Sequence, residues 1–297
     1  MEPENPRALC FLDFFSGIGG IRLGLEQAGL RCLGHCEIDK FADRSYRAIH
    51  DTKEDEFFAA NIRAVEPGDL PVADCYAFGF PCQPFSRGSG QRKAFEDIRG
   101  TLVFEVLRLA AVRKPQVLFA ENVEGILDVS GGYVFGRILD AMGELGYFVE
   151  WQLINSAAYL PQNRPRVYIV GHYGGPPDRS VFPICPSDAE PRLIRAGWLN
   201  TENTFRQSNV LYSPDGISPC LVTNDDRPKF LMPDGRVRIL SPLEKWRLQG
   251  FPDDAYYRAA AVCGETQLHK QAGNSVSVPV IAAIGRRIAE SRKEVNP

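Results

Sequence analysis

One cysteine stands out in the sequence because prolines flank it closely. Cys82 lies between Pro81 and Gln83, with Pro84 next, at the end of the apolar run 74–80. Each proline fixes its own φ and biases the preceding residue towards extended backbone, so the thiol is presented in a defined direction. A thiolate is reactive near neutral pH, which makes a covalent nucleophile the chemistry that fits. A buried structural cysteine is the alternative.

Three charged residues further along could hold a polar ring or an anion. Glu121 lies at the end of the apolar segment 117–122, where a carboxyl can act as an acid or as a hydrogen-bond partner. Arg164 and Arg166 are two residues apart on a segment expected to be extended, so both should point the same way. Together they could reach one anionic or carbonyl-bearing substrate. A solvated carboxyl and a solvated charge pair are the alternatives.

A glycine-rich stretch near the N-terminus predicts a site for a nucleoside cofactor. Glycines allow close approach of the backbone to a ligand, and the start of the following helix favours an anionic group. The stretch contains Phe15, Ser16, Gly17, Gly19 and Gly20. An ordinary glycine turn is the alternative.

Two charged residues near this stretch refine the expected ligand. Glu37, at the end of the next predicted strand, is placed to accept hydrogen bonds from a ribose. Arg22 occupies the position where a dinucleotide-binding fingerprint has its third glycine. An amino-acid-bearing nucleoside such as S-adenosylmethionine is therefore favoured over a dinucleotide.

The elements that must position these residues alternate between strand and helix patterns. Continuous apolar runs predict buried strands, and apolar residues at helical spacing predict the helices between them. Two further strands, 148–156 and 166–173, are expected to pair antiparallel. The predicted fold is α/β, a doubly wound, mostly parallel sheet with strands at 9–15, 32–39, 74–80 and 117–122 and helices at 21–29, 41–50, 99–114 and 133–147.

The pattern changes near Gly174. Residues 174–237 are proline-rich and irregular, with weak strands at best, and are interpreted as a small second domain or a long functional insertion between 1–173 and 238–297. Regularity returns at Ser241, which with Pro242 and Glu244 fits the start of a capped helix. A final helix is expected at 278–290.

Composition excludes several classes of protein. The chain has 297 residues, a net charge of −3 and 44% hydrophobic residues, as expected for a soluble globular protein. No apolar stretch approaches the roughly 18 residues that span a bilayer, and the first residues do not form a secretory signal. The eight cysteines show no CxxC pair and no metal-ligand spacing with the histidines, which favours a reducing, cytoplasmic setting and no metal.

The sequence resembles the DNA cytosine-5 methyltransferase family across nearly its whole length. The matching motifs, in the family's order, are FLDFFSGIGG, CEID, GFPCQPFS followed by FEDIRGTL, ENV, QNRPRVYIVG, LSPLEKWRLQGFP and QAGNSVSVPV. The resemblance implies a Rossmann-like, S-adenosylmethionine-dependent fold, in which 1–173 and 238–297 form the catalytic domain and 174–237 the target-recognition domain.

The resemblance implies roles for the residues around Cys82. A cytosine of duplex DNA would be flipped out, Cys82 would attack C6, and C5 would take the methyl group from S-adenosylmethionine, leaving S-adenosylhomocysteine. Glu121 would hold N3 and the exocyclic amine, and Arg166, paired with Arg164, the carbonyl of the base. Substrate contacts are further expected from Pro81, Ser86 and Asn122, with 86–100 as a mobile loop over the DNA.

On the cofactor side the resemblance implies contacts to adenine, ribose and the methionine end. The residues concerned are Phe15, Ser16, Gly17, Gly19, Gly20, Glu37, Ile38, Asn61, Ile62, Pro81, Asn274 and Ser275. Some of these positions depart from the family pattern. Ile38 replaces an aromatic residue found in some members, Asn61 replaces an aspartate, and Cys220 stands in 217–223 where threonine is usual.

The resemblance also implies a partner for the protein. Double-stranded DNA is the expected partner of a monomeric, bacterial or phage-encoded enzyme, with a cognate restriction endonuclease acting separately. The candidates for reading bases are Arg192, Arg195, Arg206, Arg227 and Lys229, and a solvated surface position is the alternative for each. A nicotinamide-dependent oxidoreductase, a non-catalytic DNA-binding regulator and a tRNA cytosine methyltransferase are the alternatives; Gln83 and Pro84 favour the DNA branch.

Overall fold

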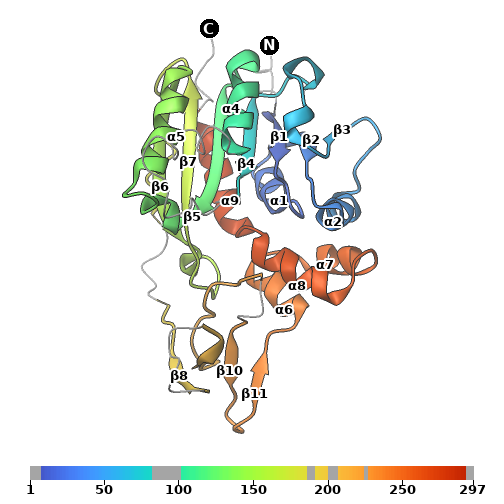
Figure 1. Cartoon of the computed structure of the whole chain (residues 1–297), viewed down its shortest axis with the longest axis vertical. Helices are drawn as coiled ribbons and strands as arrows, with labels where there is room; N and C mark the ends of the chain where they lie inside the picture. The colour runs from blue at the N-terminus through green and yellow to red at the C-terminus, as the bar shows by residue number, and fades with distance from the viewer. Residues whose placement is uncertain (1–7, 82–101, 186–190, 200–206, 224–226, 292–297) are drawn as a thin grey trace, which may run out of the picture.

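The computed structural model describes residues 8–81, 102–185, 191–199, 207–223 and 227–291. Its larger part is a seven-stranded sheet in the order β3-β2-β1-β4-β5-β7-β6 (Figure 1). The strands are β1 (Cys10–Phe14), β2 (Arg31–Cys36), β3 (Phe57–Ala59), β4 (Cys75–Gly79), β5 (Val117–Val123), β6 (Tyr147–Asn155) and β7 (Pro165–Tyr173). Strands β1 to β5 pair parallel, whereas β7 runs antiparallel to both β5 and β6.

The central strands are continuous apolar runs because helices cover both faces of the sheet. In β1, Phe11 packs against one face together with α1 (Gly20–Gln27) and α9 (Val278–Glu290). Leu12 and Phe14 pack against the other, with α4 (Leu102–Arg113) and α5 (Tyr133–Glu144). Figure 1 shows these two helical layers on either side of the sheet. The predicted doubly wound, mostly parallel sheet is therefore confirmed.

The N-terminal and C-terminal parts of the chain meet where α1 packs against α9. A Cβ added to Gly24 in α1 would stand 2.5 Å from Cβ of Ile281 and 2.9 Å from the carbonyl oxygen of Val278. A Cβ on Gly285 would stand 2.8 Å from that of Ala28. The two helices thus approach more closely than larger side chains would allow. This contact packs the C-terminal helix α9 against α1, the first of the described helices.

Below the sheet lies a smaller unit built on four short strands. They are β8 (Arg195–Trp198), β9 (Val210–Tyr212), β10 (Lys229–Leu231) and β11 (Val237–Ile239), in the order β11-β10-β9-β8. Tyr212, Leu221 and Phe230 form a separate hydrophobic cluster on one side of this sheet. Helices α6 (Pro242–Leu248), α7 (Asp253–Ala260) and α8 (Glu265–Asn274) connect it to the larger part (Figure 1).

The observed helices and strands agree with the predicted ones where the apolar pattern extends over many residues. The capped helix at Ser241 is confirmed. The side chain of Ser241 accepts from the N–H of Glu244, and the side chain of Glu244 accepts from the N–H of Ser241. The strands of the smaller unit were expected to be weak, and each has three or four residues, too few for alternation to show. Strand β3 and helices α7 and α8 were missed for related reasons: the first is short, and the other two are rich in polar residues or alanine. None of the described helices is long and apolar enough to cross a membrane.

Alanine at Gly24 should test the close approach of α1 and α9. The added methyl group overlaps Ile281, so Gly24→Ala should destabilise the protein by about 1–3 kcal/mol, the usual cost of overpacking. The matched control is Gly136→Ala in α5, where a Cβ meets nothing within 4 Å. Since alanine favours helix over glycine by about 1 kcal/mol, this control should be neutral or stabilising. Thermal denaturation measures both, and equal melting temperatures for the two variants would contradict the close approach.

Candidate active site at the carboxyl ends of the strands

A cavity of about 780 Å³ lies at the carboxyl ends of the parallel strands. Its walls come from the segments after β1, β2, β4 and β5, from α8, and from Arg164 and Arg166. Strands β1 and β4 are neighbours in the sheet although two other strands separate them in the chain. Open α/β sheets bind ligands at such a switch point, so the cavity is where the fold predicts a site.

The glycine turn after β1 forms one wall of the cavity. Gly17 and Gly19 have φ of 57° and 82°, and Phe15, two residues before Gly17, also has a positive φ of 55°. A Cβ on Gly17 would meet nothing within 4 Å, so here the bare backbone faces open space. A Cβ on Gly19 would stand 1.9 Å from Nε2 of His50, which therefore packs directly under the turn. The turn combines a strained backbone with an exposed, side-chain-free approach, as a ligand cradle requires.

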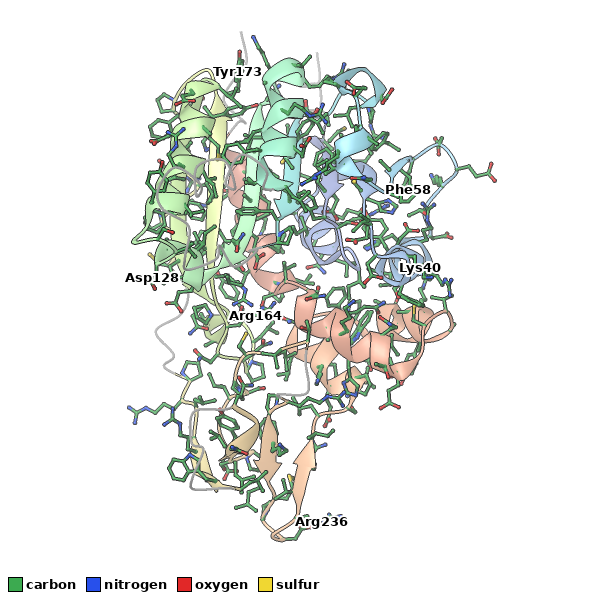
Figure 2. The ribbon with its side chains drawn as sticks, in the orientation of Figure 1. Lys40, Phe58, Asp128, Arg164, Tyr173 and Arg236 are labelled. Atoms are coloured by element: carbon green, nitrogen blue, oxygen red, sulfur yellow. The ribbon has the colours of Figure 1, made fainter. Side chains whose placement is uncertain are left out.

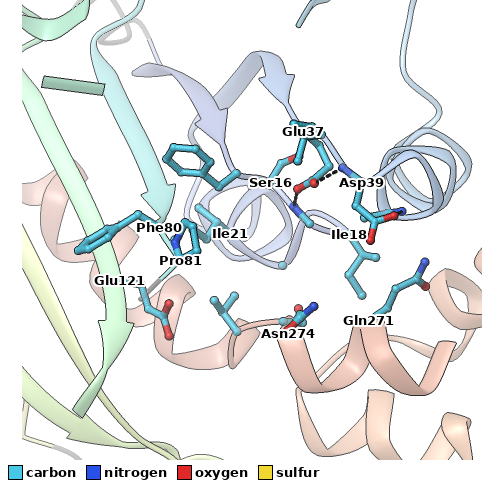
Figure 3. Close-up of a pocket in the computed structure, with 18 of the residues that line it drawn as sticks. Ser16, Ile18, Ile21, Glu37, Asp39, Phe80, Pro81, Glu121, Gln271 and Asn274 are labelled. Atoms are coloured by element: carbon cyan, nitrogen blue, oxygen red, sulfur yellow. Dashed lines mark hydrogen bonds between the residues drawn. The ribbon is translucent and has the colours of Figure 1, made fainter. Parts of the chain in front are cut away.

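Glu37 ties the glycine turn to the start of α2 (Lys40–His50). Its Oε2 accepts from the N–H of Gly17 and its Oε1 from the N–H of Asp39, both at 2.7 Å (Figure 3, dashed lines). Burial raises the pKa of Glu37, although these hydrogen bonds oppose the rise. Each oxygen keeps a second lone pair, so the carboxylate could still accept from two neighbouring hydroxyls of a ligand.

The other residues predicted for the nucleoside surround this end of the cavity. Ile38 is 75% exposed, and Asn61 is exposed while its Oδ1 accepts from the N–H of Arg63 at 3.1 Å. Ser16 is buried, and its hydroxyl has no partner in the described structure. An open glycine backbone, a carboxylate and an unpartnered hydroxyl fit a nucleoside carrying both hydroxyls and charge. The predicted residues that line the cavity are Phe15, Ser16, Gly17, Gly20, Glu37, Ile38, Asn61, Ile62, Pro81, Asn274 and Ser275.

Glu121 and Arg166 form an ion pair at the opposite end of the cavity. Nε of Arg166 lies 3.2 Å from Oε1 of Glu121, and each side chain is 11% exposed. In the β5–β7 ladder Val123 is opposite Arg166, so Glu121 and Arg166 are diagonal neighbours on one face. Burial raises the pKa of Glu121, and the positive charges of Arg166 and Arg164 only partly offset this.

Arg164 lies beside this pair but has main-chain partners. Its Nη1 donates to the carbonyl of Leu221 at 3.4 Å, and its Nη2 donates to the carbonyls of Gly273 and Ser275. The side chain is buried, and burial, followed by the charge of Arg166, lowers its pKa. The structure therefore brings both predicted arginines to the cavity but gives them different surroundings, since Arg164 joins three segments of the chain.

Asn122 points to the other face of β5 and holds the end of β4. Its Nδ2 donates to the carbonyl of Phe80 at 2.9 Å, and its Oδ1 accepts from the N–H of Val123 at 2.8 Å. Phe80 and Pro81 both line the cavity (Figure 3). Asn122 thereby positions the backbone immediately before Cys82.

Several residues in or beside the cavity have little functional signal in the sequence pattern. Gln162 is fully buried, donates to the carbonyl of Leu248 at 2.7 Å and accepts from the N–H of Leu221 at 3.4 Å. On α8, Lys270 pairs with Asp39 at 3.0 Å, and both line the cavity. The glutamine in QNRPR was the available signal for Gln162, whereas nothing in the polar sequence of α8 indicated a cavity wall.

Gly19, predicted for the cofactor, does not line the cavity, and other predicted residues either lie away from it or fall outside the described residues. Cys82, Ser86 and Arg206 fall outside the described residues, as does the loop 86–100. Arg192 and Arg195 are exposed, Arg227 and Lys229 are half-buried, and none of these four lines the cavity. Among the residues that the structure describes, no group of three or more His, Cys, Asp or Glu could hold a metal ion.

The burial of Glu121 predicts a particular pH dependence of stability. Its raised pKa means that the charged form is disfavoured in the folded state, so Glu121 destabilises the protein above that pKa and ceases to do so as the pH falls. The melting temperature of Glu121→Gln relative to wild type should therefore be higher at pH 8 than at pH 5. Glu244 is the opposite control, because hydrogen bonds from Arg238 lower its pKa to about 2. Glu244→Gln should lose stability at pH 8 and lose less as the pH falls; the same trend in both variants would contradict this.

Comparisons with known proteins agree on one family. The family model for C-5 cytosine-specific DNA methylase matches residues 9–190 and 194–290. Type II methyltransferase M.NlaX of Neisseria lactamica is 32% identical, covering 96% of this chain and 97% of its own length. Type II methyltransferase M.NgoBI of Neisseria gonorrhoeae is 34% identical, with 92% and 90% covered.

Solved structures share the fold at lower identity. The Entamoeba histolytica methyltransferase EhMeth has a TM-score of 0.75 at 17% identity, with 97% of this chain and 100% of that chain covered. A putative DNA modification methyltransferase from an Escherichia coli prophage has a TM-score of 0.69 at 20% identity, with 97% and 100% covered. The family match extends over both the sheet and the smaller unit. The chain thus belongs to the C-5 cytosine-specific DNA methylase family and is a DNA cytosine-5 methyltransferase.

Proposed function

We propose that the protein transfers the methyl group of S-adenosylmethionine to C5 of a cytosine flipped out of duplex DNA, through a bond between Cys82 and C6. The observation that carries the proposal is a single cavity with two chemically different ends. Glu37 and the glycine turn lie at one end, and Glu121 lies at the other, with Pro81 between them (Figure 3). A cofactor and a base could occupy these ends and meet beside the residue that follows Pro81.

The cofactor end would hold S-adenosylmethionine. Glu37 would accept from the ribose hydroxyls, and Phe15, Ile38 and Asn61 would surround the adenine. Asn274 and Ser275, at the end of α8, would hold the methionine part. Bound there, the cofactor supplies an electrophilic methyl group, and the protein supplies the orientation that directs it towards the other end of the cavity.

The base end would activate C5 of the cytosine. The Cys82 thiolate forms a bond to C6 while Glu121 donates a hydrogen bond to N3, so that electron density reaches C5. C5 then bonds to the methyl group, loses its proton, and the C6–sulfur bond breaks to release Cys82 and 5-methylcytosine. The raised pKa of Glu121 supports this role, because a protonated carboxyl can donate to a ring nitrogen that an ionised one would repel.

The two arginines and Asn122 would fix the base in place. Arg166, held by Glu121, would donate to the carbonyl of the base. Arg164 would not contact the base. Its buried hydrogen bonds to the carbonyls of Leu221, Gly273 and Ser275 would instead support the wall of the cavity. Asn122 would fix the position of Pro81 and its carbonyl relative to the base, because its Nδ2 donates to the carbonyl of Phe80.

We further propose that 174–237 is the target-recognition domain and that the enzyme acts as a monomer. Two relatives whose names identify them as Type II methyltransferases match this chain over most of its length, which supports a role beside a separate restriction endonuclease. Expression in methylation-free cells followed by bisulfite sequencing tests the activity and reads the target sequence directly. Parallel assays on duplex DNA and tRNA distinguish the substrates, and the absence of methylated cytosine in every duplex would overturn the proposal.

Replacing Cys82 should separate catalysis from cofactor binding. Cys82→Ala removes the nucleophile, so transfer of labelled methyl groups to duplex DNA should fall by at least about 1000-fold, as when other enzymes lose a nucleophile. The affinity for S-adenosylmethionine, measured by calorimetry, should stay unchanged. Cys185→Ala, which changes an exposed cysteine, is the control and should keep wild-type activity. Retained turnover by Cys82→Ala would exclude the covalent mechanism.

Replacing Glu37 should weaken the cofactor without affecting DNA. Glu37→Ala removes the acceptor for the ribose and for the N–H groups of Gly17 and Asp39, so the dissociation constant for S-adenosylmethionine should rise about 10- to 100-fold. Glu37→Gln keeps one acceptor and should lose less. Calorimetry with S-adenosylmethionine and gel-shift titration with DNA measure the two affinities. Unchanged cofactor affinity in Glu37→Ala would place the ribose elsewhere.

A further inference from the structure

Cys220 occupies an unusual position between the two arginines of the active site. Its sulfur lies 3.5 Å from Nη1 of Arg164 and 3.7 Å from Nη2 of Arg166, within reach of hydrogen bonds from both. The residue is half-buried and belongs to the segment 217–223, whereas Arg164 immediately precedes β7 and Arg166 lies within it. A single side chain of the smaller unit thus contacts both arginines.

The contacts of Arg166 show what Cys220 adds. Nη1 donates to the carbonyl of Pro165 at 2.7 Å, Nε pairs with Glu121 at 3.2 Å, and Nη2 reaches Cys220. The first partner comes from the adjacent residue and the second from β5. Cys220 is the partner that comes from the smaller unit. It is the third group that limits rotation of the Arg166 guanidinium, after Pro165 and Glu121.

The backbone around Cys220 is itself firmly held. Its carbonyl accepts from Nε2 of Gln207 at 3.0 Å. The next residue, Leu221, donates its N–H to Gln162 at 3.4 Å and accepts from Arg164 through its carbonyl at 3.4 Å. The backbone at Cys220 and Leu221 is therefore held by Gln162 and Arg164 on one side and by Gln207 on the other. A displacement of this segment would reach Arg166 through the sulfur.

We propose that Cys220 is a positioning residue that holds the guanidinium of Arg166 in its ion pair with Glu121. Through this contact, the position of the smaller unit on DNA would influence the geometry of the base pocket. The proposal rests on the proposed function, since it concerns the same pocket. Sulfur accepts hydrogen bonds weakly, but two guanidinium donors converge on it. A side chain of similar size with an oxygen acceptor should perform the same task, and one without an acceptor should not.

Threonine and valine provide the matched pair of variants, because they have nearly the same shape and differ in the hydroxyl. Cys220→Val should lower kcat about 3- to 10-fold, the effect expected from one lost hydrogen bond. Cys220→Thr and Cys220→Ser should stay within about twofold of wild type on the same reasoning. The dissociation constant for S-adenosylmethionine should not change in any of them. Cys185→Val is the control for an exposed cysteine and should behave as wild type.

The pH profile of kcat gives a readout that a purely structural role would leave in place. Glu121 faces Arg164, Arg166 and Tyr168, and the two arginines lower its pKa against the effect of burial. If valine loosens Arg166, this lowering weakens and the midpoint attributed to Glu121 moves to higher pH. Threonine should restore the wild-type midpoint.

The outcomes separate cleanly. A kcat loss and a shifted midpoint in Cys220→Val, both restored in Cys220→Thr, support the proposal. Wild-type kcat and midpoint in the valine variant overturn it, as does an equal loss in valine and threonine variants with unchanged melting temperatures. A wild-type protein that methylates no DNA overturns the proposed function first and this inference with it. Should valine lower the melting temperature, Cys220→Ser decides, because it keeps an acceptor in a smaller side chain.

Discussion

The buried guanidinium of Arg164 is the contact on which the arrangement of the molecule depends. Burying such a charge costs several kcal/mol unless acceptors surround it, so its position is tightly constrained. The acceptors are main-chain carbonyls of Leu221, Gly273 and Ser275. These carbonyls come from two segments that are both far from Arg164 in the chain, namely the smaller unit at Leu221 and the end of α8 at Gly273 and Ser275. One side chain thereby joins the smaller unit to the end of α8 beside the cavity (Figure 2, where Arg164 lies at the junction).

The neighbouring contacts repeat this principle with neutral groups. Gln162 binds the carbonyl of Leu248 and the N–H of Leu221, and Gly273 lets the backbone of Val222 approach to 2.8 Å of where a Cβ would stand. Ionic and amide side chains thus hold together surfaces that are too polar for hydrophobic packing. Keeping them buried leaves the cavity beside them open.

The two ends of the cavity depend on different kinds of element. The cofactor end is formed by turns that follow β1 and β2, whose backbone N–H groups are held by Glu37. The base end is formed by side chains on β5 and β7, where the antiparallel ladder sets the distance between Glu121 and Arg166. A turn can adapt to a ligand, whereas a ladder keeps its side chains in register. In the proposed function, this difference suits a cofactor that exchanges after every turnover and a base that is held rigidly.

Local patterns in the sequence were sufficient for the sheet and for many of the side chains at the cavity. Apolar runs predicted the buried strands because helices cover both faces, and the glycine turn and the ends of the strands indicated where Glu37 and Glu121 would lie. The capped start of α6 was readable because its hydrogen bonds join residues only three apart. The polar helices α7 and α8 were not readable, since their burial depends on neighbours distant in the chain.

The sequence by itself determined which chemical groups are present and which strand carries each of them. Only the tertiary structure decided their partners: that Arg164 binds main-chain carbonyls while Arg166 binds Glu121, and that Cys220 reaches both arginines. Arginines two residues apart look equivalent in a strand pattern, because the pattern records direction but not what lies in that direction. The carbonyls and the sulfur belong to segments more than fifty residues away, and only folding brings them within hydrogen-bond distance.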